Sequence, residues 1–211
     1  MHVVLITSVL RPVKDHTVFS TNQRIEQTLK TIETVRNKIP EAYIVMIEGG
    51  HITEQEKEKF YNLVDHLFVT DITHLTKSPG EATLLNRYLT SEYFKPYTVK
   101  TLSKISGRYY LNDDFNWNMM PKDKFIIGFI PIAWMGRPLY NTRYYRIPRK
   151  YINYFIEGLA RYIASKEFIT SSPDIEHCFY QHNIIKHDEV YCPKRLGVCG
   201  LITGTNEFMS E

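Results

Sequence analysis

The feature that most constrains the fold is a repeated change of hydrophobic period in the first half of the chain. Residues 3–6 form a continuous apolar, largely β-branched run, which is typical of a strand buried on both faces. Apolar residues then recur at steps of three and four over 25–39, which predicts an amphipathic helix ending at Pro40. A second apolar run follows at 43–47. A strand, a helix and a strand in this order predict a crossover connection and a parallel sheet.

The alternation continues along the chain. Thr53 with Glu56 has the pattern of a capping box ahead of a second helix. Residues 66–70 predict a short third strand. Another helix start is predicted at 78–81, with Ser78 as the cap, proline at the first position and an acid at the third.

Residues 99–111 predict the last helix and strand of this half. The three-residue spacing of Val99, Leu102 and Ile105 predicts a helix that ends at Gly107, and 108–111 then predict the fourth strand.

The second half is less regular and rich in tyrosine. It predicts a strand at 125–131, a strand or extended loop at 140–147, and helices at 148–164 and 173–186. The whole chain, 1–211, therefore predicts a single α/β domain. Its mostly parallel central sheet has helices on both faces, and its second half is a helical, aromatic-rich elaboration. Such sheets bind ligands at the carboxyl ends of their strands.

Composition narrows the class of partner. Lys and Arg number 26 against 23 Asp and Glu, a net charge of +3 with neutral histidines. This charge is too small for a protein whose main role is to bind duplex nucleic acid, so we expect no nucleic-acid partner. The hydrophobic fraction of 43% indicates a folded globular chain rather than a disordered one.

Cysteines and the chain ends bear on location. Three cysteines without CxxC spacing argue against a disulfide framework or a structural zinc site and favour a reducing compartment, the cytoplasm. The apolar run at 3–10 is too short to span a membrane, and it lacks the flanks of a signal peptide. The final residues 209–211 form no obvious cap, which is compatible with further domains in a longer polypeptide.

Two adjacent carboxylates, Asp113 and Asp114, follow the predicted fourth strand, beside Asn112. Oxygen ligands of this kind suit Mg²⁺ or Mn²⁺ bridging a diphosphate. The same three residues are also common in an ordinary turn after a strand. The pattern alone leaves both interpretations open.

A longer pattern around these acids resembles a known family. The stretch 104–115, KISGRYYLNDDF, is similar to the metal and sugar-nucleotide signature of GT-A-fold glycosyltransferases. Patches at 174–180, 196–200 and 203–204 resemble the same group, which includes enzymes that build capsule and viral surface glycans, among them the glycan of a viral major capsid protein. The resemblance implies a Rossmann-like GT-A domain and a nucleotide-sugar donor, which we expect to be a UDP-sugar. It also implies a glycan or glycoprotein acceptor and, for a viral enzyme, the host-cell cytoplasm.

The resemblance also assigns roles and divides the chain. Residues 1–118 would bind the nucleotide sugar, and 119–211 would face the acceptor. The family's Asp-x-Asp motif falls on Asn112, Asp113 and Asp114, so Asn112 departs from the pattern and brings no charge. Because Asn112 and Asp114 share a face of an ideal strand, we expect Asp114 to be the main ligand of Mn²⁺ or Mg²⁺ and Asp113 the second candidate.

Further donor-binding candidates lie along the first half. Thr7, Ser8 and Glu48 stand where the family holds the nucleoside. Fixed cations stabilise the charge that develops on a departing diphosphate. Lys104 and Arg108 are candidates for this role, and Arg24 could reach a phosphate. Their alternatives are loop hydroxyls for Thr7 and Ser8, and ordinary helix-end or surface cations for the three basic residues.

Two acids near the carboxyl terminus are the candidates for catalysis. Glu176 and Asp174 could face the acceptor hydroxyl or the anomeric carbon, because glycosyl transfer must move one proton and accommodate an oxocarbenium-like centre. The alternative for Asp174 is a role at a helix start, and the alternative for Glu176 is a solvent-facing helical side chain.

The aromatic second half could form a sugar-stacking acceptor wall, or it could be core or a contact surface for a partner domain. The residues concerned are Trp134, Tyr140, Tyr144 and Tyr145, with Arg137 and Arg143. The leading hypothesis is a metal-assisted glycosyltransferase that moves a sugar from a nucleotide sugar to a glycan, with retention favoured by the resemblance. One alternative is a nucleotidyltransferase acting on sugar phosphates. The other is a non-catalytic carbohydrate-binding module, for which the tyrosines would form the binding surface.

Overall fold

The computed structural model describes residues 1–12, 18–73, 75–131, 136–170, 174–202 and 207–211. A seven-stranded sheet runs through its centre in the order β3-β2-β1-β4-β7-β6-β8. The strands are β1 (His2–Ser8), β2 (Ala42–Glu48), β3 (His66–Val69), β4 (Thr101–Ser106), β6 (Phe125–Ile130), β7 (Leu139–Pro148) and β8 (Val190–Tyr191). The chain is a mixed α/β domain, as the sequence predicts.

The sheet is parallel on one side and mixed on the other. β1 pairs in parallel with β2 and with β4, and β2 pairs in parallel with β3. β7 is antiparallel to both β4 and β6, while β8 is parallel to β6. A second, antiparallel sheet has the order β10-β9-β5, formed by β10 (Phe208–Ser210), β9 (Val198–Leu201) and β5 (Tyr109–Leu111).

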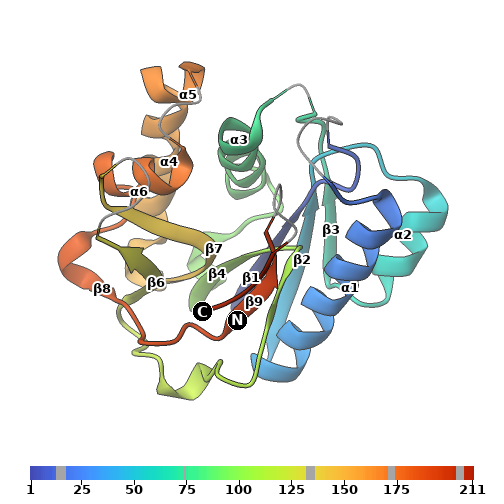
Figure 1. Cartoon of the computed structure of the whole chain (residues 1–211), viewed down its shortest axis with the longest axis horizontal. Coiled ribbons are helices and arrows are strands. Elements are labelled where there is room, and N and C mark those ends of the chain that lie inside the picture. The colour runs from blue at the N-terminus through green and yellow to red at the C-terminus, as the bar shows by residue number, and fades with distance from the viewer. Residues whose placement is uncertain (13–17, 74, 132–135, 171–173, 203–206) are drawn as a thin grey trace.

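Helices cover both faces of the central sheet (Figure 1). They are α1 (Thr21–Lys38), α2 (Glu54–Tyr61), α3 (Lys77–Leu89), α4 (Ile152–Ile163), α5 (Lys166–Thr170) and α6 (Ile175–Gln181). Val4 and Ile6 of β1 pack with α1 and α2 in one core, and Val3 and Leu5 pack with α3, α4 and α6 in the other. The alternation of side chains along one strand thus feeds two hydrophobic layers.

Short 3₁₀ turns at Pro96–Thr98, Trp117–Met119, Arg149–Tyr151 and His187–Glu189 complete the connections. Within the described ranges, no helix combines the length and apolar character needed to cross a membrane.

The helix predicted from Val99 to Gly107 is wrong, because residues Thr101–Ser106 form strand β4. Leu102 lies opposite Val3 of β1 in the register, and each neighbouring residue of β4 is buried. The strand period is hidden in the sequence by two buried polar residues, Ser103 and Lys104. Both have partners in the fold, the hydroxyl of Tyr144 and the carboxylate of Glu81 respectively. The predicted fourth strand at 108–111 is consequently β5, which belongs to the small sheet.

Other predicted boundaries shift as well. The second helix has the predicted capping box, with both reciprocal bonds between Thr53 and Glu56. The helix predicted to start at 78–81 begins at Lys77, after Thr76, and the hydroxyl of Ser78 accepts a hydrogen bond from the backbone N–H of Ile175 instead of capping. The helix predicted over 173–186 is α6 alone. Its first predicted residue, 173, is outside the described residues, as are 203–204.

Candidate functional site

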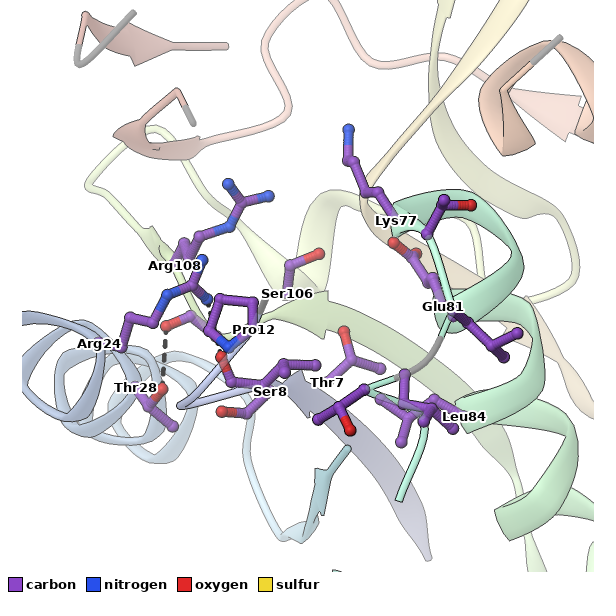
Figure 2. A pocket seen from close by; sticks show the side chains of 17 residues that line it. Thr7, Ser8, Pro12, Arg24, Thr28, Lys77, Glu81, Leu84, Ser106 and Arg108 are labelled. Atoms are coloured by element: carbon purple, nitrogen blue, oxygen red, sulfur yellow. Dashed lines mark hydrogen bonds between the residues drawn. The ribbon is translucent and has the colours of Figure 1, made fainter. Parts of the chain in front are cut away.

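A cavity opens at the carboxyl ends of β1 and β4, the edge at which parallel α/β sheets bind ligands (Figure 2). Thr7 and Ser8 end β1 on its floor, and Ser106 ends β4 beside them. α1 and α3 supply the walls. The described residues that line it are Thr7, Ser8, Val9, Pro12, Arg24, Thr28, Ile72, Thr73, Leu75, Thr76, Lys77, Gly80, Glu81, Leu84, Ser106, Gly107 and Arg108.

Gly107 brings the β4 end against β1 and α1. Its N–H donates to the carbonyl of Thr7 at 2.9 Å, and its carbonyl accepts from the hydroxyl of Thr28 at 3.2 Å. A Cβ atom at this position would lie 2.9 Å from the Thr28 hydroxyl oxygen. Glycine is therefore needed for the close approach that points the next residue, Arg108, toward the cavity.

Two guanidinium groups, those of Arg24 and Arg108, lie on the same side of the cavity (Figure 2). Arg24 is buried and donates from Nη1 to the carbonyl of Val9 at 2.9 Å. Burial and the nearby positive charge of Arg108 lower the pKa of Arg24 to about 10, so it remains a cation at neutral pH. Arg108 makes no ion pair with a carboxylate in the described part of the chain.

Glu48 braces the loop after β1 from beneath and does not line the cavity. It is fully buried, and its Oε1 accepts from the N–H of Leu10 at 2.9 Å. Burial raises the pKa of Glu48 to about 7, against the opposing effect of hydrogen bonds from Leu10, Ser8 and Gly50. This is a supporting position for the loop that carries Ser8.

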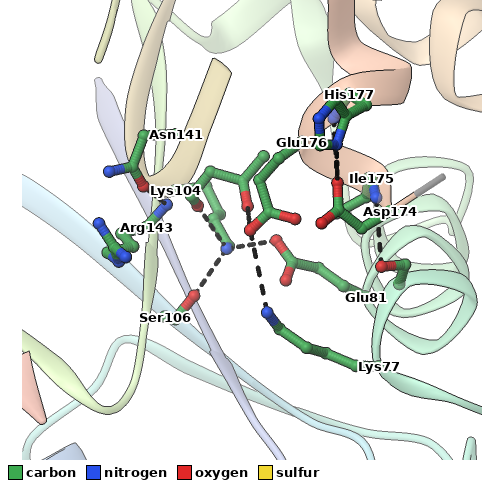
Figure 3. Close-up of polar contacts among 12 residues, drawn as sticks. Lys77, Glu81, Lys104, Ser106, Asn141, Arg143, Asp174, Ile175, Glu176 and His177 are labelled. Atoms are coloured by element: carbon green, nitrogen blue, oxygen red, sulfur yellow. Dashed lines mark hydrogen bonds and ion pairs between the residues drawn. The ribbon is translucent and has the colours of Figure 1, made fainter. Parts of the chain in front are cut away.

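Across the cavity, α3 contributes Lys77 and Glu81 (Figures 2 and 3). Glu81 forms an ion pair with Lys104, whose side chain is fully buried beneath the cavity. Lys104 also donates to the hydroxyl of Ser106 and to the carbonyl of Thr142, each at 2.8 Å. Lys104 therefore sits behind the lining and acts on the cavity through Glu81 and Ser106.

A second cavity adjoins the first and shares Lys77, Glu81, Ser106 and Arg108 with it. Its other described lining residues are Tyr109, Thr142, Arg143, Glu176 and Ile202. Glu176, from the first turn of α6, accepts from the hydroxyl of Thr142 at 3.1 Å and lies 3.9 Å from the ammonium of Lys77 (Figure 3). Its other carboxylate oxygen is buried and has no hydrogen-bond partner among the described residues.

Asp174 lines neither cavity. It caps α6, accepting from the N–H of His177 at 3.2 Å and contacting the imidazole Nδ1 of the same residue at 2.6 Å. This is the helix-start role that the sequence allowed as the alternative. Asp174 thus fixes the helix that presents Glu176.

The structure does not bring Asn112, Asp113 and Asp114 into either cavity. They follow β5 in the small sheet, each with a partner. Asn112 donates to the hydroxyl of Ser210 at 3.0 Å. Asp113 lies 3.0 Å from Lys38, and Asp114 lies 3.2 Å from Arg195.

The donor set of the two cavities does not fit a divalent cation of the Mg²⁺ or Mn²⁺ kind. Their only described carboxylates are Glu81, paired with Lys104, and Glu176, held by Thr142 and near Lys77. No group of three His, Cys, Asp or Glu in the described ranges is arranged to hold a metal. The metal role of Asp114 and Asp113 stays a prediction.

The three tyrosines of the predicted acceptor wall are core rather than exposed. Tyr140, Tyr144 and Tyr145 are buried in β7. Trp134 lies outside the described residues. The sequence pattern did not predict Lys77 as a cavity residue, and it predicted only a helix-start role for Glu81. A lysine inside a buried apolar segment, Lys104, was the available signal that a carboxylate must face it.

No protein-family model and no curated protein sequence matches the chain. Two solved structures that resemble its fold are crystal structures of the glycosyltransferase GlyE of Streptococcus pneumoniae TIGR4, one of them the apo form. Both have a TM-score of 0.53, with 9% and 10% sequence identity. Each match covers 92% of this chain and 45% of GlyE, so this chain spans less than half the length of that protein. The likeness shows a GT-A-like glycosyltransferase fold.

Proposed function

We propose that this chain is a glycosyltransferase that moves a sugar from a nucleoside diphosphate sugar, UDP-linked, to a hydroxyl of a glycan or glycoprotein. The observation that carries the proposal is the cavity at the ends of β1 and β4, where Arg24 and Arg108 lie together in a GT-A-like fold. Anionic ligands with two adjacent phosphates match such a pair of guanidinium groups.

The remaining lining suits the rest of a donor. The hydroxyls of Thr7 and Ser8 can hydrogen-bond a nucleoside, and the apolar side chains of Ile72, Leu75 and Leu84 offer surface to a ring. This assigns residues 1–118 mainly to the donor. Glu176 reaches the adjoining cavity from the second half of the chain.

The second cavity is the proposed place of transfer. There the bond between the anomeric carbon and the diphosphate oxygen breaks, and the electron pair leaves with the diphosphate. The acceptor oxygen bonds to the anomeric carbon and gives up its proton. Glu176 is our candidate to receive that proton or to stabilise the positive anomeric centre, because one of its oxygens is buried without a described partner. Asp174 would act by positioning α6, and a direct catalytic role for it stays a prediction.

The glycan acceptor is proposed on the sequence hypothesis alone, namely the expected resemblance to enzymes of viral capsid glycans. Retention of the anomeric configuration and assistance by Mn²⁺ or Mg²⁺ at Asp114 are parts of the sequence hypothesis that remain to be measured. A cytoplasmic location likewise remains a proposal.

The test is a thermal-shift screen of nucleoside diphosphate sugars, followed by turnover assays. A ligand that binds only the folded state raises the Tm in proportion to its affinity and concentration. We expect stabilisation by a UDP-sugar and release of UDP when a glycan acceptor is added. Pyrophosphate release from a nucleoside triphosphate plus a sugar phosphate would instead indicate a nucleotidyltransferase. Glycan binding with no response to any nucleotide would indicate a carbohydrate-binding module.

A further inference from the structure

The first cavity carries an excess of positive charge. Its described lining has three cationic side chains, Arg24, Arg108 and Lys77, and one carboxylate, Glu81. That carboxylate is already neutralised by the buried ammonium of Lys104. The described lining therefore favours an anionic ligand. It has no unpaired carboxylate with which to bind a cation.

The two arginines are held so that their charges face the same space. Arg24 is fixed by its bond to the carbonyl of Val9, and Arg108 is placed by the tight Gly107 position at the end of β4. Glu48, the acid whose charge acts on Arg24, is buried and points at the backbone of Leu10. Its raised pKa of about 7 leaves it partly neutral near pH 7, so it compensates the charge of Arg24 incompletely. Like charges held together at a partly buried position are stabilised by an anionic ligand.

The usual alternative to cationic side chains is a divalent ion held by carboxylates. Here the acids expected to hold it, Asp113 and Asp114, follow a strand of the other sheet and contact Lys38 and Arg195. The side chain of Asp113 is fully exposed. Neither acid lines the cavity that contains the arginines.

We infer that the chain binds the diphosphate of its donor without a divalent cation, with Arg24 and Arg108 contacting the phosphates on one side and Lys77 approaching from the other. This rests on the proposed function. It assigns the charge neutralisation that a metal ion would supply to three side chains of the protein. The bound leaving group would then be stabilised by fixed guanidinium and ammonium groups.

The experiment is isothermal titration calorimetry with UDP as the probe and the full chain as the receptor, in EDTA and in excess Mn²⁺. We expect the Kd in EDTA to stay within about threefold of the Kd in Mn²⁺. Arg108→Gln should weaken binding roughly 10- to 100-fold in both conditions, because a hydrogen bond to a charged group is lost. Lys77→Gln should weaken it less, since Lys77 is largely exposed.

The matched control is Arg161→Gln. Arg161 is an exposed arginine of α4 that contacts the ring of Tyr154 and lines neither cavity. It should bind UDP as the wild type does, and circular dichroism should show all variants folded. Binding that vanishes in EDTA and returns with Mn²⁺, or an unaltered Kd in Arg108→Gln, would overturn the inference while leaving a glycosyltransferase in place. Absence of UDP binding under both conditions would remove the inference, and absence of binding by every nucleoside diphosphate sugar would remove the proposed function as well.

Discussion

Arg108 and Asp114 are close in the sequence, but the fold gives them opposite surroundings. Arg108 follows the carboxyl end of β4 in the central sheet and lines a cavity with Arg24 and Lys77. Asp114 follows β5 of the small sheet and contacts Arg195. The first charge faces a concave space without a described carboxylate partner, and the second is neutralised on the surface. A charged side chain thus indicates a ligand site when the fold leaves its charge without an opposite partner. A short run of acids in the sequence does not show whether the fold leaves them unpaired.

The largest expected difference between the cavity and the acidic turn is in the free energy of unfolding, when the lysine that pairs with an acid in each region is replaced. Lys104→Met should lower the free energy of unfolding by about 3–5 kcal/mol, because it leaves the Glu81 carboxylate without its buried partner. Urea denaturation monitored by circular dichroism measures this. Glu81→Leu combined with Lys104→Met should recover part of the loss, since the unpaired charge is then gone.

Lys38→Met is the matched control in the other region. It breaks the pair with Asp113, which is fully solvated, so we expect no measurable change in the urea midpoint. Equal losses for Lys104→Met and Lys38→Met would show that the cavity edge and the acidic turn are held in the same way, and would break the comparison.

The next effect concerns the carboxylate of the second cavity. Glu176→Gln should reduce sugar transfer by about 100-fold or more, because the amide cannot take a proton or carry the charge of the carboxylate. The Kd for UDP should change little, since Glu176 lines only the cavity next to the proposed diphosphate site. Release of UDP in the presence of acceptor measures the first, and calorimetry measures the second.

Glu157→Gln, on the exposed side of α4, is the control and should keep full activity. A Glu176→Gln variant with wild-type turnover would exclude the proposed role of this carboxylate. A variant that loses turnover only in proportion to UDP affinity would place Glu176 in donor binding rather than in transfer.

A smaller effect is expected from the acid beneath the cationic cavity. Burial raises the pKa of Glu48 from 4.5 to about 7, so the folded state holds more protons than the unfolded state between these values. Stability contributed by this group is therefore lost as pH rises, by about 2 kcal/mol between pH 5 and 8. Glu48→Gln should remove that part of the slope, and urea denaturation of both proteins across this range tests it. Parallel pH profiles for the two proteins would contradict the assignment.

Most of the first half of the fold was predictable because the apolar residues of its strands and helices recur with the spacing typical of each element. β1, α1, β2, α2 and β3 follow from apolar runs and caps that act locally. β4 was not predictable in this way, because Ser103 and Lys104 are polar in the sequence, and their partners include residues of β7 and α3 that are distant in the chain. Long-range pairing of this kind leaves no periodic signal.

The candidate site was likewise predicted in part. Thr7, Ser8, Arg24 and Arg108 are all candidates from the sequence, and the fold brings them to one cavity. β1 and β4 are neighbouring parallel strands whose carboxyl ends carry Thr7, Ser8 and Arg108, and α1 supplies Arg24 beside them. The prediction places the acids at 113–114 at the carboxyl ends of the central strands only because it makes 108–111 the fourth strand of the central sheet. Once β4 occupies that place, the acids move to the small sheet.

The smallest effect is expected at the acidic turn itself. Asp114→Asn removes a half-exposed pair with Arg195, which is worth at most about 1 kcal/mol, so stability should hardly change. The Kd for UDP should stay within about twofold of wild type in EDTA and in Mn²⁺, because Asp114 lines neither cavity. The metal hypothesis predicts the opposite, a loss confined to the Mn²⁺ titration. A tenfold loss seen only with Mn²⁺ would mean that the turn moves to the diphosphate when donor binds, and that the separation of the two charged regions holds only for the free protein.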